Sequence, residues 1–117
     1  MMTPLEASAH IGSQLPQLRK ELQQQKKNDL YHSIQTLTDY TRRMAIEHNF
    51  GMVEKCMLLV EQLYKKGNAL VKNAVENVFI FSLSSIINFC NIIEWKIIQS
   101  YMPSCLYALY IRQVMEA

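Results

Sequence analysis

Apolar residues recur at intervals of three and four along most of this chain, the spacing that places them on one face of an α-helix. Glycine is scarce, with three residues in 117, and dipeptides typical of β-turns are nearly absent. No stretch alternates apolar and polar residues convincingly enough to compete as a β-strand. The pattern predicts an all-α fold. A chain of this length fits one domain, so we expect a single all-helical domain over residues 1–117.

The N-terminal part of the chain predicts two short helices. Thr3-Pro4-Leu5-Glu6 has the form of a capping box with proline at the first helical position, and the helix that it starts ends near Gly12. A second helix begins near Leu15-Pro16. Its thin apolar stripe consists of Leu15, Leu18 and Leu22, and the polar stretch QQQKKND ends it.

Two longer amphipathic helices follow. The first takes Asp29 as its N-cap, and its apolar face consists of Leu30, Ile34, Leu37, Thr41, Met44, Ala45 and His48. The second follows HNFG, and its stripe consists of Val53, Cys56, Met57, Val60, Leu63 and Tyr64. Gly67 supplies the residue after this helix, at the C′ position. Short connections predict that the two helices lie antiparallel.

The stretch VFIFSLSSIINFCNII, residues 78–93, contains no charged residue. On a helical wheel, a narrow polar arc is formed by Asn73, Asn77, Ser84, Asn88 and Asn91. Nearly everything else is apolar, and Phe89 and Ile93 fall on the same side as Phe79. A helix that is apolar over most of its circumference is typical of the centre of a bundle. We therefore expect a central helix at about 70–90 that the rest of the chain covers on most sides.

The helices around this centre fit two architectures. One is a compact bundle, and the other is a HEAT- or armadillo-like stack of antiparallel helical hairpins. No clean sequence period decides between them. Asn91-Ile92-Ile93-Glu94 resembles a capping arrangement and predicts that a new helix begins there, and Pro103 then kinks or splits that helix.

The expected location is the cytoplasm. The N-terminus lacks a basic segment followed by an apolar one, so we see no export signal. Three widely spaced cysteines suit a reducing compartment better than a disulfide scaffold. A membrane-spanning helix needs about 20 mostly apolar residues, whereas Glu76 and Glu94 bracket the uncharged run at a shorter separation. We expect no membrane span.

No motif for catalysis or cofactor binding is found. Gly12, Gly51 and Gly67 do not form a phosphate-binding loop, and CxxC and HExxH patterns are missing. His32 and His48 lie sixteen residues apart on one predicted helix, too far along its axis to share a metal ion. The cysteines are explained by packing. We expect a protein that is not an enzyme and holds no metal or cofactor.

The charge pattern favours a protein partner. With 12 basic and 10 acidic residues the net charge is only +2, which disfavours a nucleic-acid partner. The basic pairs Lys26-Lys27, Arg42-Arg43 and Lys65-Lys66 are interleaved with acids. Residues 67–117 carry few charges and many aromatics, and aromatic and arginine residues are enriched in binding hot spots. The predicted partner-binding residues are Phe81, Tyr101, Tyr107, Tyr110, Arg112, Arg42 and Arg43. A homodimer would also use this surface.

Several segments resemble a family of small, all-helical bacterial proteins of unknown function. They are Leu15-Pro16-Gln17-Leu18, Tyr31-His32, Phe50 at a helix start, LYKKGN and VKNAVENVFIFSLS. The resemblance spans roughly residues 15–95, with VKNAVENVFI as its most specific part, and it does not cover the tail beyond Trp95. It carries no catalytic motif and therefore implies no active-site residue.

Small helical proteins of this kind are also similar to immunity proteins of bacterial toxin systems, including contact-dependent growth inhibition. In those systems a cytosolic partner binds a delivered toxin domain and occludes its active site. The likeness is one of size, compactness and lack of catalytic residues. It implies a protein-binding module that neutralises a toxin by stoichiometric binding.

Two other functions remain open. The first is a helical pocket for a small apolar or nucleotide-like ligand, lined by Phe, Met and Ile side chains between the central helix and its neighbours. It requires Asn73, Asn77 or Asn88 to converge on that pocket. The second is a regulatory nucleic-acid binder, whose affinity would depend on salt.

Overall fold

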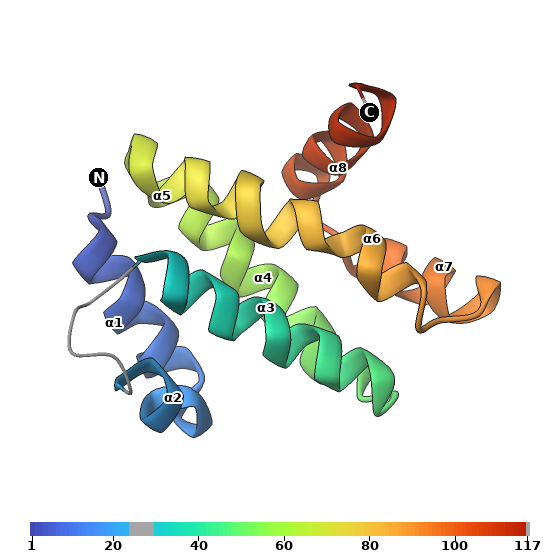
Figure 1. Ribbon diagram of the computed structural model, residues 1–117, viewed down its shortest axis with the longest axis horizontal. Coiled ribbons are helices and arrows are strands. Elements are labelled where there is room, and N and C mark those ends of the chain that lie inside the picture. Colours follow the sequence, from blue (N-terminus) through green and yellow to red (C-terminus); the bar gives the residue numbers. More distant parts are fainter. Residues whose placement is uncertain (24–29, 117) are drawn as a thin grey trace.

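Helices follow one another along almost the whole chain (Figure 1). The computed structural model describes residues 1–23 and 30–116. The elements in chain order are α1 (Pro4–Gln14), η1 (Pro16–Leu18), α2 (Arg19–Gln23), α3 (Leu30–Ile46), α4 (Phe50–Lys66), α5 (Ala69–Ala74), η2 (Val75–Ile80), α6 (Phe81–Ile87), α7 (Ile92–Tyr101) and α8 (Ser104–Glu116). These described residues form no named strand. The predicted all-α fold is confirmed, and its form is a compact bundle with principal extents of 39 × 29 × 20 Å.

Helix α1 begins where the sequence predicts. The Thr3 side chain accepts a hydrogen bond from the Glu6 backbone N–H at 3.3 Å, and Pro4 occupies the first position. The Thr3 hydroxyl also donates to the Glu6 carboxylate at 3.1 Å. In a capping box the carboxylate would accept from the Thr3 backbone N–H, and here it accepts from the Thr3 side chain. The helix continues two residues past Gly12 to Gln14. After it, Leu15 and Leu18 are buried in the core as predicted.

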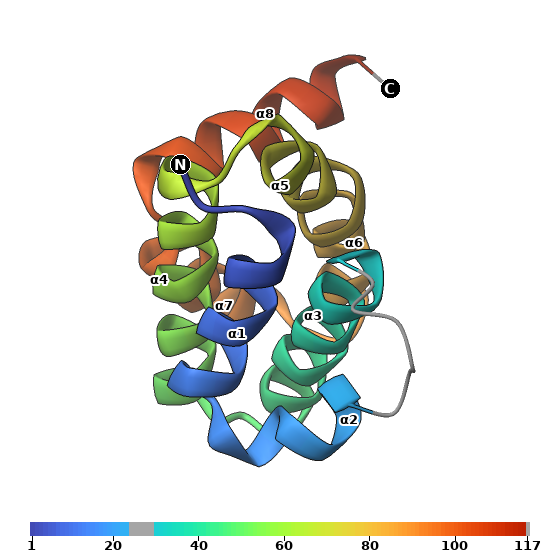
Figure 2. The same ribbon diagram turned by 90° about the vertical axis from the view of Figure 1, so that its left-hand side faces the viewer.

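Helix α3 lies in the middle of the bundle, in contact with α1, α2, α4, α5, η2 and α6. Figure 2 shows α1, α3 and α4 side by side, with α8 crossing over the other helices at a large angle. The buried face of α3 is wider than its apolar stripe, because it also includes Ser33, Thr36, Thr38 and Thr41. The predicted N-cap of this helix, Asp29, lies outside the described residues.

The buried hydroxyls of α3 are satisfied locally. Thr38 donates to the carbonyl of Ile34 at 2.7 Å, and Thr36 and Thr41 make the same bond to the residue four positions earlier at 2.8 Å. The hydroxyls of Ser33 and Ser8 lie 2.7 Å apart and join α3 to α1. A buried polar group costs little once it is hydrogen-bonded. A threonine-rich helix can therefore occupy the centre of this core.

Segments α5, η2 and α6 form one continuous helix over residues 69–87, in which η2 is a π-helical turn. The predicted extent of about 70–90 is therefore close. Its buried residues are Val71, Ala74, Val75, Phe79, Ile80, Leu83 and Ile86. The helix is buried on the sides that face the rest of the chain, and the exposed residues are the predicted polar arc together with Leu70 and Phe81. The more polar α3 is also central, and its buried threonine hydroxyls bond their own backbone.

The turn between α4 and α5 depends on Gly67. This glycine ends α4 as predicted, but its backbone is extended (φ −73°, ψ 153°) and not left-handed. A Cβ at this position would overlap the Leu63 carbonyl oxygen and the Val71 side chain. The N-terminal segment also packs here, since Met2 N–H donates to the Lys66 carbonyl at 2.6 Å and Asn68 N–H donates to the Met2 carbonyl at 2.9 Å. Glycine is needed for close packing.

The C-terminal helices separate at the two predicted breaks. Asn91 caps α7, and Pro103 lies between α7 and α8. Leu106 and Leu109 of α8 are buried against the body of the protein. The Tyr110 ring contacts Trp95 of α7 edge to face, with centroids 5.7 Å apart.

Candidate protein-binding surface

Three large apolar side chains project into solvent at the connection between α6 and α7. Phe89 is 56 % exposed, Ile92 is 76 % exposed and Ile93 is 72 % exposed. The two isoleucines are the first residues of α7. We call this cluster of Phe89, Ile92 and Ile93 the α6–α7 corner. Its side chains contribute little to the internal core, so their apolar character is not explained by folding.

Hydrogen bonds fix the backbone of the α6–α7 corner. The Asn91 side chain accepts from Glu94 N–H at 2.8 Å, and the Glu94 carboxylate accepts from Asn91 N–H at 3.1 Å, which completes a capping box. Nδ1 of His48, in the turn between α3 and α4, lies 2.5 Å from the other carboxylate oxygen of Glu94. His48 adopts a left-handed backbone with φ 61°, a conformation in which histidine is enriched several-fold among non-glycine residues. The corner is thus held from two sides.

The sequence prediction placed Phe89 and Ile93 on the buried side of the central helix, and this is wrong. That helix ends at Ile87, and α7 starts at Ile92. Residues between them follow a turn, so a wheel of 100° per residue no longer describes where their side chains point. The capping signal at Asn91 marks the break, and it could have identified the exposed residues.

A small groove of about 150 Å³ separates α6 from α8. Its lining consists of Ile80, Phe81, Ser84, Tyr110, Gln113 and Val114, and we call it the Phe81 groove. Phe81 is 72 % exposed, the largest value for any aromatic side chain in the described parts of the chain. Burial raises the pKa of Tyr110, in keeping with a ring that is partly enclosed by its neighbours.

Of the predicted partner-binding residues, Phe81 and Tyr110 are brought together in the Phe81 groove. Arg112, on α8, instead pairs with Glu76, with Nη2 and Oε1 3.3 Å apart. The Tyr64 hydroxyl donates to the same oxygen at 3.2 Å, and the Gln113 amide donates to the Glu76 carbonyl at 2.8 Å. Arg112 therefore helps to attach α8 to the wide turn of η2.

The two remaining predicted tyrosines do not line the groove. Tyr107 is an exposed residue of α8, and Tyr101 is half-buried at the end of α7. Sequence reasoning grouped them with Tyr110 because all three are aromatic and close in the chain.

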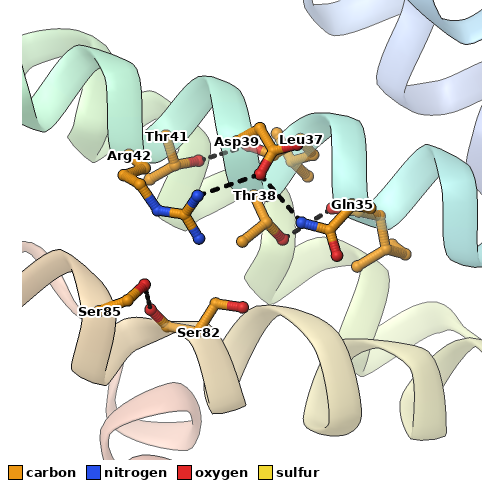
Figure 3. A network of polar contacts seen from close by, with 9 residues as sticks. Gln35, Leu37, Thr38, Asp39, Thr41, Arg42, Ser82 and Ser85 are labelled. Carbon is orange, nitrogen blue, oxygen red and sulfur yellow. Dashed lines mark hydrogen bonds and ion pairs between the residues drawn. The ribbon is translucent and has the colours of Figure 1, made fainter.

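The predicted arginine pair does not form one rim, because its members point in different directions. Arg42 pairs with Asp39 at 3.3 Å, and Figure 3 shows its guanidinium between α3 and the helix that carries Ser82 and Ser85. Its Nε is buried and has no hydrogen-bond partner. Arg43 lies over the Tyr40 ring, 5.3 Å from the centroid, and its Nη2 is 3.8 Å from the Glu21 carboxylate in α2. Only Arg42 lies near α6.

Two of the three cysteines lie in surroundings that favour the protonated thiol. Cys56 is buried, and desolvation raises its pKa even though a hydrogen bond with Thr41 and the charge of Lys55 act in the opposite direction. Burial is also the main cause that raises the pKa of Cys90, with a smaller contribution from Glu94. Among the residues described, no group of three or more His, Cys, Asp or Glu side chains is placed to hold a metal ion.

Two cavities in the described part of the chain can be compared with the ligand-pocket hypothesis. A cavity of about 280 Å³ is lined by Leu5, Ser8, Ala9, Gly12, Ser13, Arg19, Leu22 and Gln23, between α1 and α2. Neither this cavity nor the Phe81 groove includes Asn73, Asn77 or Asn88, which are exposed to solvent. Their amides do not converge on either cavity.

One stretch, Ala69–Ile86, is long and apolar enough to cross a membrane when judged by length and composition alone. In the fold, 39 % of it is buried against the rest of the chain. The core helix of a folded domain meets the same criterion, so this stretch carries no functional conclusion.

Comparison with known proteins identifies the family to which this chain belongs. No curated protein and no solved structure matches the chain. A family profile described as a domain of unknown function matches residues 8–116. The expected resemblance to all-helical proteins of unknown function is confirmed in that respect, and the match extends past Trp95 into the tail that the expected resemblance left out. Because the match covers nearly the whole chain, this protein belongs to the family described as Domain of unknown function (DUF7674).

Proposed function

We propose that this chain is a non-enzymatic protein-binding module that takes a protein partner on the α6–α7 corner. The observation that carries the proposal is the exposure of Phe89, Ile92 and Ile93 on a backbone that is fixed from two sides. Single exposed apolar residues are common on protein surfaces. Exposed apolar residues that gather in one place favour an interaction site, and the α6–α7 corner has three within five residues of the chain.

The energetics favour a partner at this position. Full burial of an isoleucine or phenylalanine side chain is worth about 1.5–3 kcal/mol, and most of each side chain in the α6–α7 corner is still in water. A partner that covers all three would gain several kcal/mol. Since the capping box and the His48–Glu94 contact already order the backbone, little conformational entropy is lost on binding.

Polar groups surround the corner as they do the apolar centre of an interface. Asn88, Asn91 and His48 are exposed beside it. The predicted arginines are less suitable as a centre, because Arg42, Arg43 and Arg112 each face an acidic residue of this chain. They remain candidates for a peripheral role.

The most specific form of the proposal is an immunity protein in the bacterial cytoplasm, which binds a toxin domain and occludes its active site. The small all-helical fold supports it. The net charge of +2 suits a partner held by shape and apolar contact, because a strongly acidic surface is not offered. A toxin domain with an apolar rim around its active site is the expected partner.

The test begins with the gene next to the one that encodes this chain. A neighbour that encodes a large secreted protein ending in a toxin domain supports the proposal, and a housekeeping neighbourhood contradicts it. The toxin domain is then expressed with this chain. The expected result is a 1:1 complex in which the toxin is inactive.

Matched variants locate the binding site. Ile92→Ser combined with Ile93→Ser is expected to weaken the complex at least roughly tenfold, about 1.4 kcal/mol. Leu5→Ser is the control, because Leu5 is a similarly exposed apolar residue (60 %) on α1. Circular dichroism checks that both variants are folded. Equal affinities for the two variants would place the partner somewhere other than the corner.

A further inference from the structure

An uncharged line of side chains runs along the solvent side of the helix over residues 69–87 and onto its C-cap. Its members, one from each successive turn, are Asn73, Asn77, Phe81, Ser84 and Asn88. All five are exposed. The spacing of four from Asn73 to Phe81 spans the wide π turn, which takes more residues than an α turn. This turn keeps the line straight.

The line is nearly symmetric in chemistry about Phe81, because uncharged polar residues occupy the two positions on either side of it. Phe81 is the third of five positions, with an amide and then another amide on one side, and a hydroxyl and then an amide on the other. In an antiparallel pair of such helices related by a two-fold axis at Phe81, Asn73 would face Asn88 of the second copy. Asn77 would face Ser84, and Phe81 would face Phe81. Amide and hydroxyl groups both donate and accept hydrogen bonds, so each pair is complementary.

Charged side chains next to the line make contacts within the chain. Lys72 lies over the Tyr64 ring, 5.7 Å from its centroid, and Glu76 pairs with Arg112. The line itself carries no charge, and Lys72 and Glu76 beside it have opposite signs. A strongly charged partner, in contrast, would find no free counter-charge on it.

The Phe81 groove lies beside the centre of the line. Its volume of about 150 Å³ is similar to that of an engineered cavity in another protein that binds benzene. One phenyl ring is therefore a suitable occupant. In a two-fold pair, the Phe81 ring of each copy would reach the groove of the other, against Tyr110 and Val114.

From these features we propose that a second copy of this chain binds along the line, in an antiparallel pair of 69–87 helices with Phe81 at the two-fold axis. This interface is isologous, as is usual for dimers. Its centre at Phe81 lies about two helical turns from Asn88, where the line borders the α6–α7 corner, so Phe89, Ile92 and Ile93 stay outside the line.

Self-association is measured by sedimentation velocity from micromolar to millimolar concentrations. The unaltered chain is expected to show a reversible species of twice the monomer mass. Phe81→Asp places two carboxylates at the axis and is expected to weaken association by roughly tenfold or more. Leu5→Asp on α1 is the control and is expected to dimerise normally. A chain that stays monomeric at millimolar concentration, or a control that dissociates as readily as Phe81→Asp, would overturn the proposal.

Cross-linking tests the antiparallel register. In one chain, positions 77 and 84 are separated by about 10 Å along the helix axis, beyond the Cα separation that a disulfide allows. A chain with Asn77→Cys and Ser84→Cys is therefore expected to form a covalent dimer on mild oxidation. Asn73→Cys with Ser84→Cys is the mismatched control, and the unaltered chain with its three cysteines sets the background. Equal yields from the matched and mismatched pairs would exclude this register.

The two proposals fail independently. The Ile92→Ser and Ile93→Ser chain is expected to dimerise like the unaltered protein. If it does not, the surface that holds the second copy includes the corner, and the proposed interface is wrong.

Discussion

His48 and Glu94, which are 46 residues apart in the sequence, bind each other across the α6–α7 corner. Nδ1 of His48 lies 2.5 Å from Oε2 of Glu94, and Oε1 of the same carboxylate accepts from Asn91 N–H. A single carboxylate therefore completes the capping box of α7 and joins this helix to the turn between α3 and α4. The exposed apolar corner is built on a supported backbone.

Replacement of the α7 cap tests how much this support contributes. Asn91→Ala removes the acceptor for Glu94 N–H and is expected to lower the free energy of unfolding by about 1 kcal/mol. Asn77→Ala is the control, because Asn77 is exposed inside a helix, where alanine is the better helix former. The measurement is urea denaturation of both variants. Equal midpoints would show that the cap does not stabilise the fold.

Two glycines are expected to respond to alanine in opposite directions. Gly67→Ala should lower the free energy of unfolding by about 1–3 kcal/mol, because the added methyl group overlaps the Leu63 carbonyl and the Val71 side chain. Gly51→Ala should raise it by about 0.5–1 kcal/mol, since Gly51 is an exposed helical residue whose added methyl group would lie 4.0 Å from Asn49 Oδ1. Thermal unfolding of the two variants shows whether each substitution lowers or raises the stability of the fold. A destabilised Gly51→Ala would contradict the open surroundings of that position.

The hydroxyl of Thr38 is expected to matter less than its volume. Thr38 is fully buried and donates to the Ile34 carbonyl, a type of bond that slightly destabilises helices. Thr38→Val keeps the shape and should change the free energy of unfolding by less than about 1 kcal/mol. Thr38→Ala leaves a cavity and should cost more. If urea denaturation finds the valine variant as unstable as the alanine variant, the hydroxyl itself is essential.

Alkaline pH is expected to destabilise the protein. Burial raises the pKa of Cys56 above its ordinary value of 9.0, so the folded state holds this proton more tightly than the unfolded state. The stabilisation is complete below the pKa of the unfolded thiol, and it is lost as pH rises through the folded pKa. The free energy of unfolding measured by urea denaturation is therefore expected to fall above about pH 9, by at most about 1.4 kcal/mol per pH unit for this group.

The control for this prediction is Cys56→Ala, measured under reducing conditions. This variant is less stable at neutral pH because it has a cavity, but its decline should be shallower. Cys90, Tyr64 and Tyr110, whose pKa values burial also raises, contribute to the decline that remains. Parallel curves for the variant and the unaltered chain would remove Cys56 as a cause.

Sequence periodicity predicted the helices, most of their ends and much of the core, because caps and apolar spacing are local signals. It did not predict how much of α3 is buried. The helix over 69–87 is long and apolar, but no count of apolar residues reports that Thr36, Thr38 and Thr41 of α3 bond their own backbone. A polar side chain whose hydroxyl bonds a nearby backbone carbonyl can be buried, and hydrophobicity alone does not predict this.

The candidate site was predicted only in part. Phe81 and Tyr110 do meet in one groove, since both lie in the aromatic C-terminal half. The α6–α7 corner was missed because the helical wheel was extended through a turn. The contact of His48 with Glu94 depends on how α3, α4 and α7 pack together, which no local pattern contains.

The π-helical turn over Val75–Ile80 has a consequence for how this family can vary in length. It holds more residues than an α-turn requires, so loss of one residue there would leave a regular helix with both halves still facing the core. Loss of one residue elsewhere in the same helix would rotate everything beyond it by about 100° and turn Val71 or Leu83 toward water. Single-residue gaps between aligned members of the family are therefore expected to fall within Val75–Ile80.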